Sequence, residues 1–412
     1  MDNKEKNSVE EVDLTQPNRK VFLKIFTIIA YIVVFALGYE CATISYNRNF
    51  GSVPGMTVNK LNKIEKIISD NYYKKYDKKK MYNFLESAMV YGLEDPYSYY
   101  LDKDSQQEFS ENIEGKYVGV GLTLTPSESG EIMVIAPFDG SPAQEAGIKK
   151  DDIIVKINGK EYAYTDIDAA IKEMKGEEGE SVELEIKREG EENFTLTLTK
   201  SEIEYQSVAS RQIEEDIVYL RISRFDMNTY DDFVEELNKY SPDENTYLIV
   251  DLRDNPGGTV HTSVAIADLF IDKGTIITEK YRNKKPVIEE ATDGHVNVKY
   301  PIILLTNGSS ASASEILAGA LKDHEKAYLI GEKTFGKGVI NQQFKVDSNN
   351  SIVLSVAEYL TPNGTSIHGV GIEPDMEVKA DFNKSVLTLE YEEDNQLKAA
   401  LEYINTLKLV EE

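Results

Sequence analysis

Two almost entirely apolar runs, each followed by a turn and a stretch of small and apolar residues, set the architecture of this 412-residue chain. The runs are TYLIVDLR, which begins at Thr246, and YPIILLTN, which begins at Tyr300. Strands that are apolar at every position are covered on both faces, which is typical of parallel sheets connected by helices. HTSVAIADLFIDKG and SASEILAGALKD follow the runs and are expected to be those helices. The sequence therefore predicts an α/β domain over 201–380 and a closing helical segment over 381–412.

Upstream of this domain the spacing of apolar residues changes twice, as expected for a chain of two or three folded units. Over 57–115 they recur at three- and four-residue steps, for example at Leu61, Ile64 and Ile68, which predicts helices. Over 116–200, short strand-like runs and glycine turns surround one helix candidate, IDAAIKEMKG, which predicts a separate β-rich domain. We expect the helical stripes to pack within the chain, and a helical arm that forms a homodimer is the alternative.

An uncharged apolar segment, Ile25 to Tyr39, lies near the beginning of the chain. With its flanks it extends over 21–46, long enough to cross a bilayer of about 30 Å as a helix. Basic residues precede it and Glu40 follows it, which places the polar tail 1–20 in the cytoplasm and the folded domains outside. We therefore expect a single-pass anchor in the cell membrane, with a cleaved signal sequence as the alternative.

Composition excludes several classes of function. Acidic residues outnumber basic ones by 72 to 45, and a chain of net charge −27 is a poor partner for nucleic acid. The single cysteine, Cys41, forms neither an intramolecular disulfide nor a cysteine-ligated zinc site. The four histidines show no paired spacing, so we expect no metal and no other cofactor.

Three segments of the 201–380 domain carry groups suited to acyl transfer. The serines of 309–314 lie between a strand and a helix, where a hydroxyl is exposed beside backbone N–H groups, although helix capping is their alternative role. Lys337 has a glycine on each side, so its amine can be buried and its pKa lowered from about 10.4, as a general base requires; an exposed hairpin lysine is the alternative. The NPGG turn of 255–258 offers backbone N–H groups to an oxyanion or simply reverses the chain.

These segments, in the order DLRDNPGG, GSSASASEILAGALKD, GEKTFGKG and YLTPNGTSIHGVGIEPD, resemble the successive blocks of the C-terminal processing peptidases, the tail-specific serine proteases of bacteria and chloroplasts. The resemblance extends from about Asn59 to Asn405 and includes DPYSYYLDKD and GKYVGVGL. It implies a catalytic dyad in which Ser312 is the nucleophile and Lys337 the general base. It also implies an oxyanion hole formed by the backbone N–H groups of Ala313 and of Gly257 or Gly258.

The same resemblance identifies 116–200 as a PDZ domain. Its carboxylate-binding loop is then GVGL, and such a loop binds the terminal carboxylate of a peptide that adds to the sheet as an extra strand. We therefore expect protein substrates with accessible C-terminal tails, and we expect tail binding to switch the peptidase domain between inactive and active arrangements. The complete prediction is a multidomain α+β protein with a membrane anchor, a helical arm, a PDZ domain and an α/β serine peptidase domain. The loop residues are Gly119, Val120, Gly121 and Leu122.

One position departs from the family pattern. The family usually has a glutamine four residues after the lysine, and here that position is Asn341, with Gln342 beside it. Asn341 offers the same amide on a shorter side chain, whereas Gln342 points to the opposite face of an extended strand, so we predict that Asn341 orients Lys337. If this change has removed activity, the chain is a membrane-tethered PDZ scaffold. A catalytic role of His368 and a cell-wall hydrolase are the remaining alternatives.

Overall fold

The computed structural model describes residues 55–411 and Val33, except for positions 128, 139, 293–295, 383–385, 387, 388 and 390. The predicted tail (1–20) and anchor (21–46) lie outside the described residues, apart from Val33. No helix of the described part is both long and apolar enough to cross a membrane. The chain divides into two compact units, Met1–Lys78 and Lys79–Glu412.

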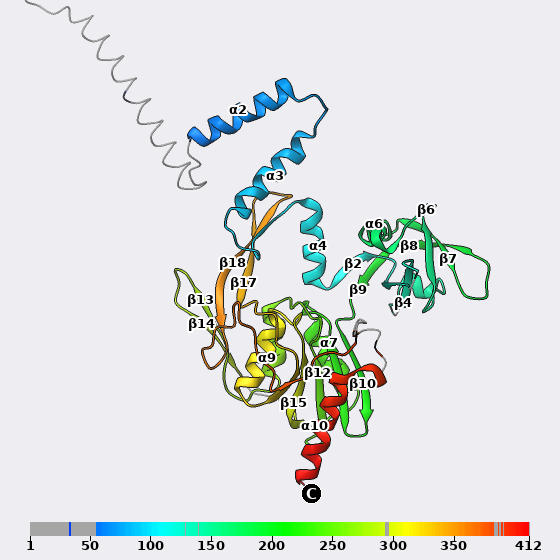
Figure 1. Ribbon diagram of the computed structural model, residues 1–412, viewed down its shortest axis with the longest axis vertical. Coiled ribbons are helices and arrows are strands. Elements are labelled where there is room, and N and C mark those ends of the chain that lie inside the picture. Colours follow the sequence, from blue (N-terminus) through cyan, green and yellow to red (C-terminus); the bar gives the residue numbers. More distant parts are fainter. Residues whose placement is uncertain are drawn as a thin grey trace, which may run out of the picture. The chain divides into compact units, whose positions relative to one another are not determined.

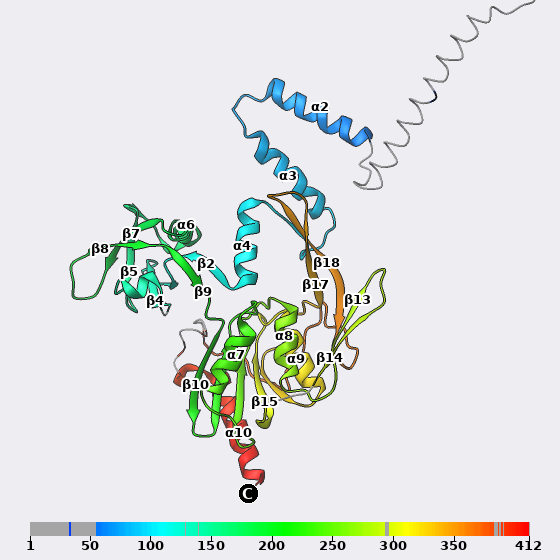
Figure 2. The ribbon, with the colours of Figure 1, turned by 180° about the vertical axis from the view of Figure 1, so that it is seen from behind.

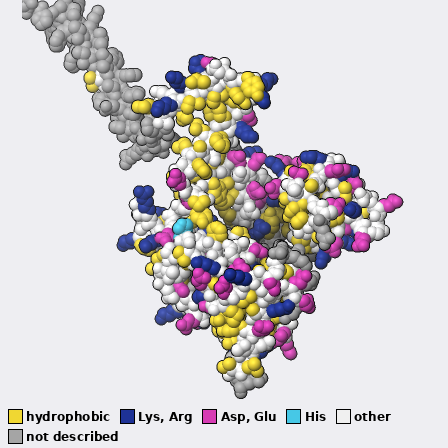
Figure 3. Space-filling view, in the orientation of Figure 1, with side chains coloured by type: hydrophobic (Ala, Val, Ile, Leu, Met, Phe, Trp, Pro, Cys, Tyr) yellow, Lys and Arg dark blue, Asp and Glu magenta, His cyan; other side chains and the backbone are white. Residues whose placement is uncertain are grey.

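The first two described helices expose their apolar side chains. Helix α2 (Gly55–Asn71) buries none of its residues, and α3 (Lys78–Tyr91) buries Val90 alone. Figure 3 shows many apolar side chains on the surface of this segment. The spacing predicted helices correctly, but the expectation that the stripes pack within the chain is not met by α3 among the described residues. The exposed side chains are those of Met56, Val58, Ile64, Ile67, Tyr72, Tyr73, Tyr82, Phe84, Leu85, Met89 and Tyr91.

The β-rich region is built on one larger and one smaller sheet. The larger has the order β3 (Leu122–Pro126), β4 (Ile132–Pro137), β5 (Ile153–Ile157), β7 (Ser181–Lys187) and β8 (Phe194–Thr199), with β6 (Lys160–Glu161) paired to β5. The smaller pairs β2 (Lys116–Gly119) with β9 (Ser201–Glu204). Helices α5 (Pro142–Glu145) and α6 (Ile167–Met174) contribute to the core. Strand β3 is an edge strand, because β4 is its sole partner in the described sheet.

A mostly parallel sheet forms the centre of the α/β region. Its order is β10 (Val208–Glu214), β11 (Ile217–Ile222), β12 (Tyr247–Asp251), β15 (Lys299–Thr306), β16 (Ala327–Gly331) and β19 (Met376–Glu377), and β10 alone is antiparallel to its neighbour. Three helices cover one face of this sheet (Figure 2): α7 (Thr229–Asn238), α8 (Val260–Asp268) and α9 (Ala313–Asp323). The other face is covered by α10 (Asn395–Glu411), which follows the short helix η3 (Tyr391–Glu393). Leu248 and Val250 pack under the three helices, whereas Ile249 packs under α10. Burial on both faces therefore explains the continuous apolar runs, as predicted.

A second, antiparallel sheet joins distant parts of the sequence. Its order is β1 (Tyr99–Leu101), β18 (Ser351–Leu360), β13 (Gly274–Tyr281) and β14 (Val287–Ala291), and β17 (Val339–Lys345) also pairs with β18, beside which it runs in Figure 1. In the β1–β18 ladder, Tyr99 lies opposite Val353. Helix α4 (Lys103–Glu114) follows β1, and its N-cap Asp102 accepts a hydrogen bond from the Ser105 N–H at 3.1 Å. Strand β1, which precedes the β-rich region, thus pairs with a strand that follows that region, and the two partners are separated by more than half of the sequence.

A buried ionic network anchors α10 beneath the central sheet. The Arg253 guanidinium, fully buried, donates to Asp251 Oδ2 at 2.6 Å and to Asp394 Oδ2 at 2.7 Å. Its Nη1 also donates to Gln396 Oε1 at 3.0 Å. Burial alone lowers the pKa of an arginine, but the two carboxylates raise the pKa of Arg253 on balance. The network ties the beginning of α10 to the strand that leads into the NPGG turn.

Candidate active site

Ser312 occupies a strained turn between β15 and α9. It is the residue that caps the helix N-terminus, and its backbone adopts φ 56° and ψ −114°. Residues other than glycine rarely adopt this conformation. Its residue surface is 9% exposed, and its neighbours Ala311 and Ala313 are buried. The strand-turn-helix arrangement predicted for the serines of 309–314 is therefore present, and among these residues Ser312 is the one with a positive φ.

The NPGG turn lies directly against Ser312. The Asn255 carbonyl accepts hydrogen bonds from the Ala311 N–H and the Ser314 hydroxyl, each at 3.0 Å, and so joins the two turns. At Gly257, where φ is 98°, an added Cβ would lie 2.8 Å from Ser312 Cβ and 2.9 Å from the Ala313 nitrogen. At Gly258, it would lie 1.9 Å from the Phe225 carbonyl oxygen. Both glycines are therefore needed for this close approach.

The two predicted glycine donors differ in what their N–H groups already bind. The Gly257 N–H donates to the Asn255 side-chain oxygen at 2.9 Å, so it is occupied. Within the described part of the chain, the N–H groups of Gly258 and Ala313 donate to no protein acceptor. Of the two glycines left open by the sequence, Gly258 is therefore the one whose N–H is available to an oxyanion.

Lys337 lies in a tight segment between two glycines. An added Cβ would come within 2.9 Å of the Gly371 nitrogen at Gly336 and within 2.6 Å of the His368 nitrogen at Gly338. Lys337 itself is partly buried, and no carboxylate of the described residues forms an ion pair with its amine. Burial lowers the Lys337 pKa, and the charges of Asp95 and Glu315 offset this only in part. A lowered pKa increases the neutral fraction of the amine near neutral pH, as a general base requires.

Glu315 connects the serine turn to the lysine segment. This fully buried carboxylate accepts hydrogen bonds from the Ser312 N–H and the Lys337 N–H on Oε2, both at 2.9 Å. Its Oε1 accepts from the Gly336 N–H at 2.7 Å and from the Thr334 hydroxyl at 2.6 Å. The sequence did not single out Glu315, although Ser312-x-x-Glu315 is a capping-box pattern that was readable there.

Tyr359 provides a second bridge between the same two residues. Its buried hydroxyl lies 3.1 Å from the Ser312 carbonyl oxygen and 3.0 Å from the Lys337 carbonyl oxygen. The structure thus brings the backbones of Ser312 and Lys337 together at two points. Their reacting atoms, the serine Oγ and the lysine Nζ, share no hydrogen bond in the described structure.

Asn341 lies on β17 and binds a residue that the sequence did not single out. Its Nδ2 donates to the Tyr97 carbonyl at 2.7 Å and to Ser355 Oγ at 3.4 Å. Its Oδ1 is buried and, among the described residues, has no hydrogen-bond partner. Gln342 is exposed, as its alternate position on the strand predicted. The predicted contact between Asn341 and the Lys337 amine is therefore not formed here, although the acceptor for it is open.

Of the described histidines, His261 and His368 are exposed, and His324 lies apart from Ser312. His324 caps the far end of the 11-residue helix α9, about 18 Å from Ser312 at 1.5 Å per residue. Its Nε2 lies 2.8 Å from the Thr275 carbonyl oxygen. His368 is exposed, and its ring meets Tyr97 edge-on at 5.9 Å between centroids. His324 is therefore too far from Ser312 to act as its base.

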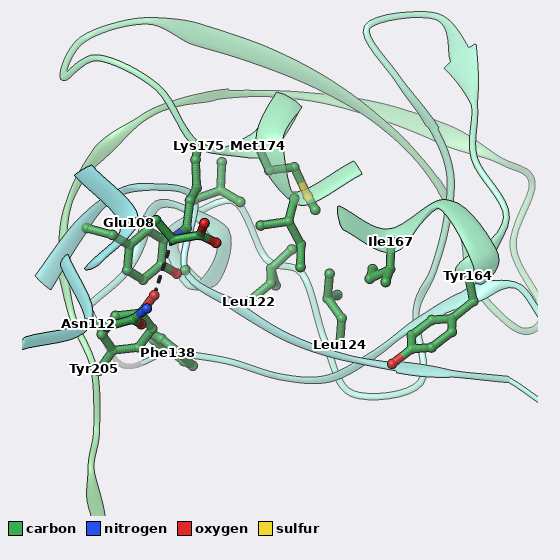
Figure 4. A pocket seen from close by; sticks show the side chains of 14 residues that line it. Glu108, Asn112, Leu122, Leu124, Phe138, Tyr164, Ile167, Met174, Lys175 and Tyr205 are labelled. Carbon is green, nitrogen blue, oxygen red and sulfur yellow. Dashed lines mark hydrogen bonds between the residues drawn. The ribbon is translucent and has the colours of Figure 1, made fainter. Parts of the chain in front are cut away.

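The predicted carboxylate-binding loop borders an apolar pocket of about 370 Å³. Val120, Gly121 and Leu122 line it, whereas Gly119 ends β2 and does not. In Figure 4, Leu122 and Leu124 of β3 and Met174 of α6 project into the pocket. Glu108 and Asn112 of α4 also line it, and neither was predicted, because both precede the β-rich region in sequence.

Ion pairing and ring contacts close one end of this pocket. Lys175 Nζ donates to Glu111 Oε2 at 2.9 Å and to the Tyr205 hydroxyl at 3.3 Å. The same amine lies 4.5 Å from the Tyr117 ring centroid. Burial lowers the pKa of Lys175, but Glu111 and Tyr205 raise it on balance, so this lysine remains charged at neutral pH.

Comparison with known proteins gives three family matches: Peptidase family S41 over 216–378, PDZ domain over 134–188, and the N-terminal domain of the activating protease CtpB over 40–105. A Staphylococcus aureus (strain COL) protein described as a "Probable CtpA-like serine protease" is 34% identical over 379 residues, which cover 88% of this chain and 75% of that protein. The carboxy-terminal processing protease CtpA of Bacillus subtilis (strain 168) is 35% identical over 324 residues, 78% of this chain and 69% of that protein. A solved structure from Bacteroides fragilis, described as belonging to the S41 proteases, shares the fold with a TM-score of 0.52 at 17% identity, covering 82% of this chain and 92% of that one.

Proposed function

Because the chain belongs to peptidase family S41 and, within it, to the C-terminal processing proteases with a PDZ domain, we propose that it cleaves protein substrates with a Ser312–Lys337 dyad. One observation carries the proposal: the buried Glu315 carboxylate binds the backbone N–H groups of both residues. The lowered pKa of Lys337 supports its role as the base. The scaffold alternative is not favoured, since the relatives are described as proteases.

In the proposed mechanism, neutral Lys337 accepts the proton of the Ser312 hydroxyl as that oxygen attacks the scissile carbonyl. The oxyanion that forms accepts hydrogen bonds from the N–H groups of Ala313 and Gly258. Protonated Lys337 then donates its proton to the departing amine, and it activates the water that hydrolyses the acyl-enzyme. The serine Oγ and lysine Nζ must first approach to about 2.6–3.2 Å, and we infer that substrate binding brings about this closure.

We propose that the PDZ region recognises the C-terminal tail of the substrate. Support comes from β3, whose free edge can pair with an extended peptide, and from the apolar pocket between β3 and α6. The terminal carboxylate would then lie on the N–H groups of the Gly119–Leu122 loop. A tailed substrate with an amidated C-terminus tests this, because it should raise KM while leaving kcat nearly unchanged.

Cleavage itself is tested by mass spectrometry of the products from a protein with an unstructured tail. Wild type should give internal fragments, and Ser312→Ala and Lys337→Ala should give none. Ser309→Ala is the matched control, since Ser309 lies exposed on the same turn and should leave cleavage intact. Asn341→Gln should preserve cleavage because it keeps the side-chain amide. Equal absence of fragments from wild type and Ser312→Ala would favour the PDZ scaffold.

We also propose that 21–46 anchors the protein in the cell membrane by a single span, with the PDZ and peptidase domains outside. The uncharged run from Ile25 to Tyr39 and the basic residues before it support this topology. Protease added to intact cells should digest the peptidase domain of the anchored protein. Recovery of that domain from the medium would favour a cleaved signal sequence.

The exposed stripes of α2 and α3 support a homodimer as a further proposal. Phe84 and Met89 of α3 are 77% and 67% exposed, which is unusual for large apolar side chains on one helix. Analytical ultracentrifugation should show a dimer for wild type and a monomer for the Phe84→Ser, Met89→Ser double variant. A wild-type monomer at all concentrations would contradict the proposal.

A further inference from the structure

The turn from Asp95 to Ser98 is held rigidly before β1. Asp95 Oδ1 accepts from the Tyr97 N–H at 3.0 Å, and Oδ2 accepts from the Ser98 hydroxyl at 2.5 Å. Ser98 Oγ in turn accepts from the Ser355 N–H of β18 at 3.0 Å. Because β1 continues this contact as a paired strand on β18, the turn is fixed to the sheet that carries β17.

This turn contacts two side chains of the candidate active site, those of Lys337 and Asn341. The Tyr97 ring centroid lies 5.3 Å from Lys337 Nζ. The Tyr97 carbonyl accepts the 2.7 Å hydrogen bond from Asn341 Nδ2, across 244 positions of sequence. The negative charge of Asp95 also acts on Lys337. A segment that precedes the PDZ region therefore forms one wall around the base.

The Tyr97 carbonyl determines what Asn341 can offer. A carbonyl oxygen accepts hydrogen bonds and cannot donate them, so the Asn341 NH₂ group must face Tyr97 and Oδ1 must face away. That Oδ1 is buried and unpartnered within the described residues, which is costly unless it serves as an acceptor. The lysine amine donates N–H groups, so this orientation suits it, whereas the opposite orientation would set donor against donor.

We propose that Tyr97 is a positioning residue for the peptidase reaction: its carbonyl orients the Asn341 amide so that Oδ1 receives the Lys337 amine, and its ring covers that amine. The inference rests on the proposed dyad and adds the residue that positions the amine of Lys337. Asp95 acts in the opposite sense to the ring, because a carboxylate favours the protonated amine and exclusion of water favours the neutral one.

Two other titratable groups surround the base and must be separated from this effect. Glu315 of α9 also favours the protonated amine. His368 packs edge-on against the Tyr97 ring, from the segment that follows β18. Glu315 is kept in every variant, and a parallel His368→Gln series removes the imidazole, so that its protonation does not enter the profiles.

The direct test measures the neutral fraction of Lys337 against pH in the full-length protein, by labelling with acetic anhydride followed by peptide mass spectrometry. Tyr97→Ala admits water, so its labelling profile should shift to higher pH than that of wild type. Asp95→Asn keeps the turn but removes the charge, so its profile should shift to lower pH. Tyr97→Phe keeps the ring and the carbonyl and should match wild type. A purely structural defect would not move two profiles in opposite directions.

Matched controls lie elsewhere in the same chain. Asp243 forms the same type of turn, in which Oδ1 accepts from the Asn245 N–H at 2.9 Å and from the Thr246 hydroxyl at 3.3 Å. Asp243→Asn should therefore leave the Lys337 profile unchanged. Tyr99, 41% exposed on β1, gives the control for ring removal, and Tyr99→Ala should likewise match wild type.

The kcat and KM of cleavage of a tailed substrate distinguish the positioning role of Tyr97 from the Ser312–Lys337 dyad on which it rests. Tyr97→Ala should lower kcat at neutral pH about 10–100-fold with little change in KM, as misplacement of a catalytic group does. If Tyr97→Ala does not fold, Asn341→Leu, which deletes the oriented acceptor, should show the same loss. Cleavage that does not depend on Ser312 would overturn the dyad, whereas the labelling profiles would still report on Tyr97. Normal cleavage with unshifted profiles, or full kcat in Asn341→Leu, would overturn the positioning role alone.

Discussion

Replacement of Glu315 by glutamine is the sharpest test of how the candidate site is held together. The substitution preserves size and shape but exchanges one carboxylate oxygen for an NH₂ group. Each oxygen now accepts two hydrogen bonds, from Ser312 and Lys337 on Oε2 and from Thr334 and Gly336 on Oε1. In either orientation of the amide, two donors that pointed at an acceptor would therefore point at another donor.

The magnitude follows from those bonds. Hydrogen bonds to a charged group contribute about 1.5–3 kcal/mol each, so the loss of two costs about 3–6 kcal/mol if nothing adjusts. The Thr334 hydroxyl can rotate to accept from the new NH₂ group, while the Gly336 N–H cannot change its role. We therefore expect the amide to face Thr334 and Gly336, and the cost to lie near the lower limit. This is a large part of the 5–15 kcal/mol by which most domains are stable.

Urea denaturation and reaction with a fluorophosphonate that labels activated serines measure the two consequences. Glu315→Gln should lower the free energy of unfolding by about 3 kcal/mol and slow labelling of Ser312 strongly. Glu332→Gln is the matched control: this carboxylate accepts one backbone bond, from the Ala380 N–H at 3.0 Å, and an amide oxygen can keep it. A Glu315→Gln protein with wild-type stability and serine reactivity would refute the bridging role.

Three further results are expected. Tyr359→Phe removes the hydroxyl near the Ser312 and Lys337 carbonyls, so it should destabilise the protein by about 1–3 kcal/mol in urea and lower kcat. Arg253→Met leaves Asp394 without its cation and Asp251 with Arg221 alone, at 3.6 Å, and should cost about 3–5 kcal/mol in the same assay. Because the folded pKa of Lys337 is lowered and only the neutral amine accepts a proton, kcat should rise with pH through that pKa, and Lys337→Arg should show no activity at any pH in stopped assays.

The strands and helices near the site were predictable because their patterns are local. An apolar run such as that of β12 has few alternatives to a strand buried on both faces, and Leu248 and Ile249 indeed pack on opposite sides. The capping-box spacing from Ser312 to Glu315 was also local, although its use was not recognised. By contrast, the bond from Glu315 to Lys337 spans 22 positions and depends on how two loops meet.

Periodicity gives the direction of a side chain but not its partner. The three- and four-residue spacing on α3 correctly predicted a helix, yet the described fold leaves Phe84 and Met89 in solvent. Tyr97 is the opposite case, a residue whose partner exists but could not be predicted from the local sequence. The local sequence DPYS does not indicate that Tyr97 lies beside Lys337 and Asn341. The contact between Tyr97 and Asn341 forms only when β1 pairs with β18.

Glu315 acts on the proposed base, Lys337, in two opposing ways, and the same substitution can separate them. Its hydrogen bonds hold the Lys337 backbone near Ser312, but its negative charge favours the protonated amine, which is inactive as a base. Burial beneath Tyr97 must therefore outweigh two carboxylates, Glu315 and Asp95, for the amine to be neutral near pH 7. In Glu315→Gln the Lys337 labelling profile should consequently shift to lower pH while kcat falls. A fall in kcat with a profile that shifts to higher pH would mean that water has entered, and that Glu315 works by sealing the site.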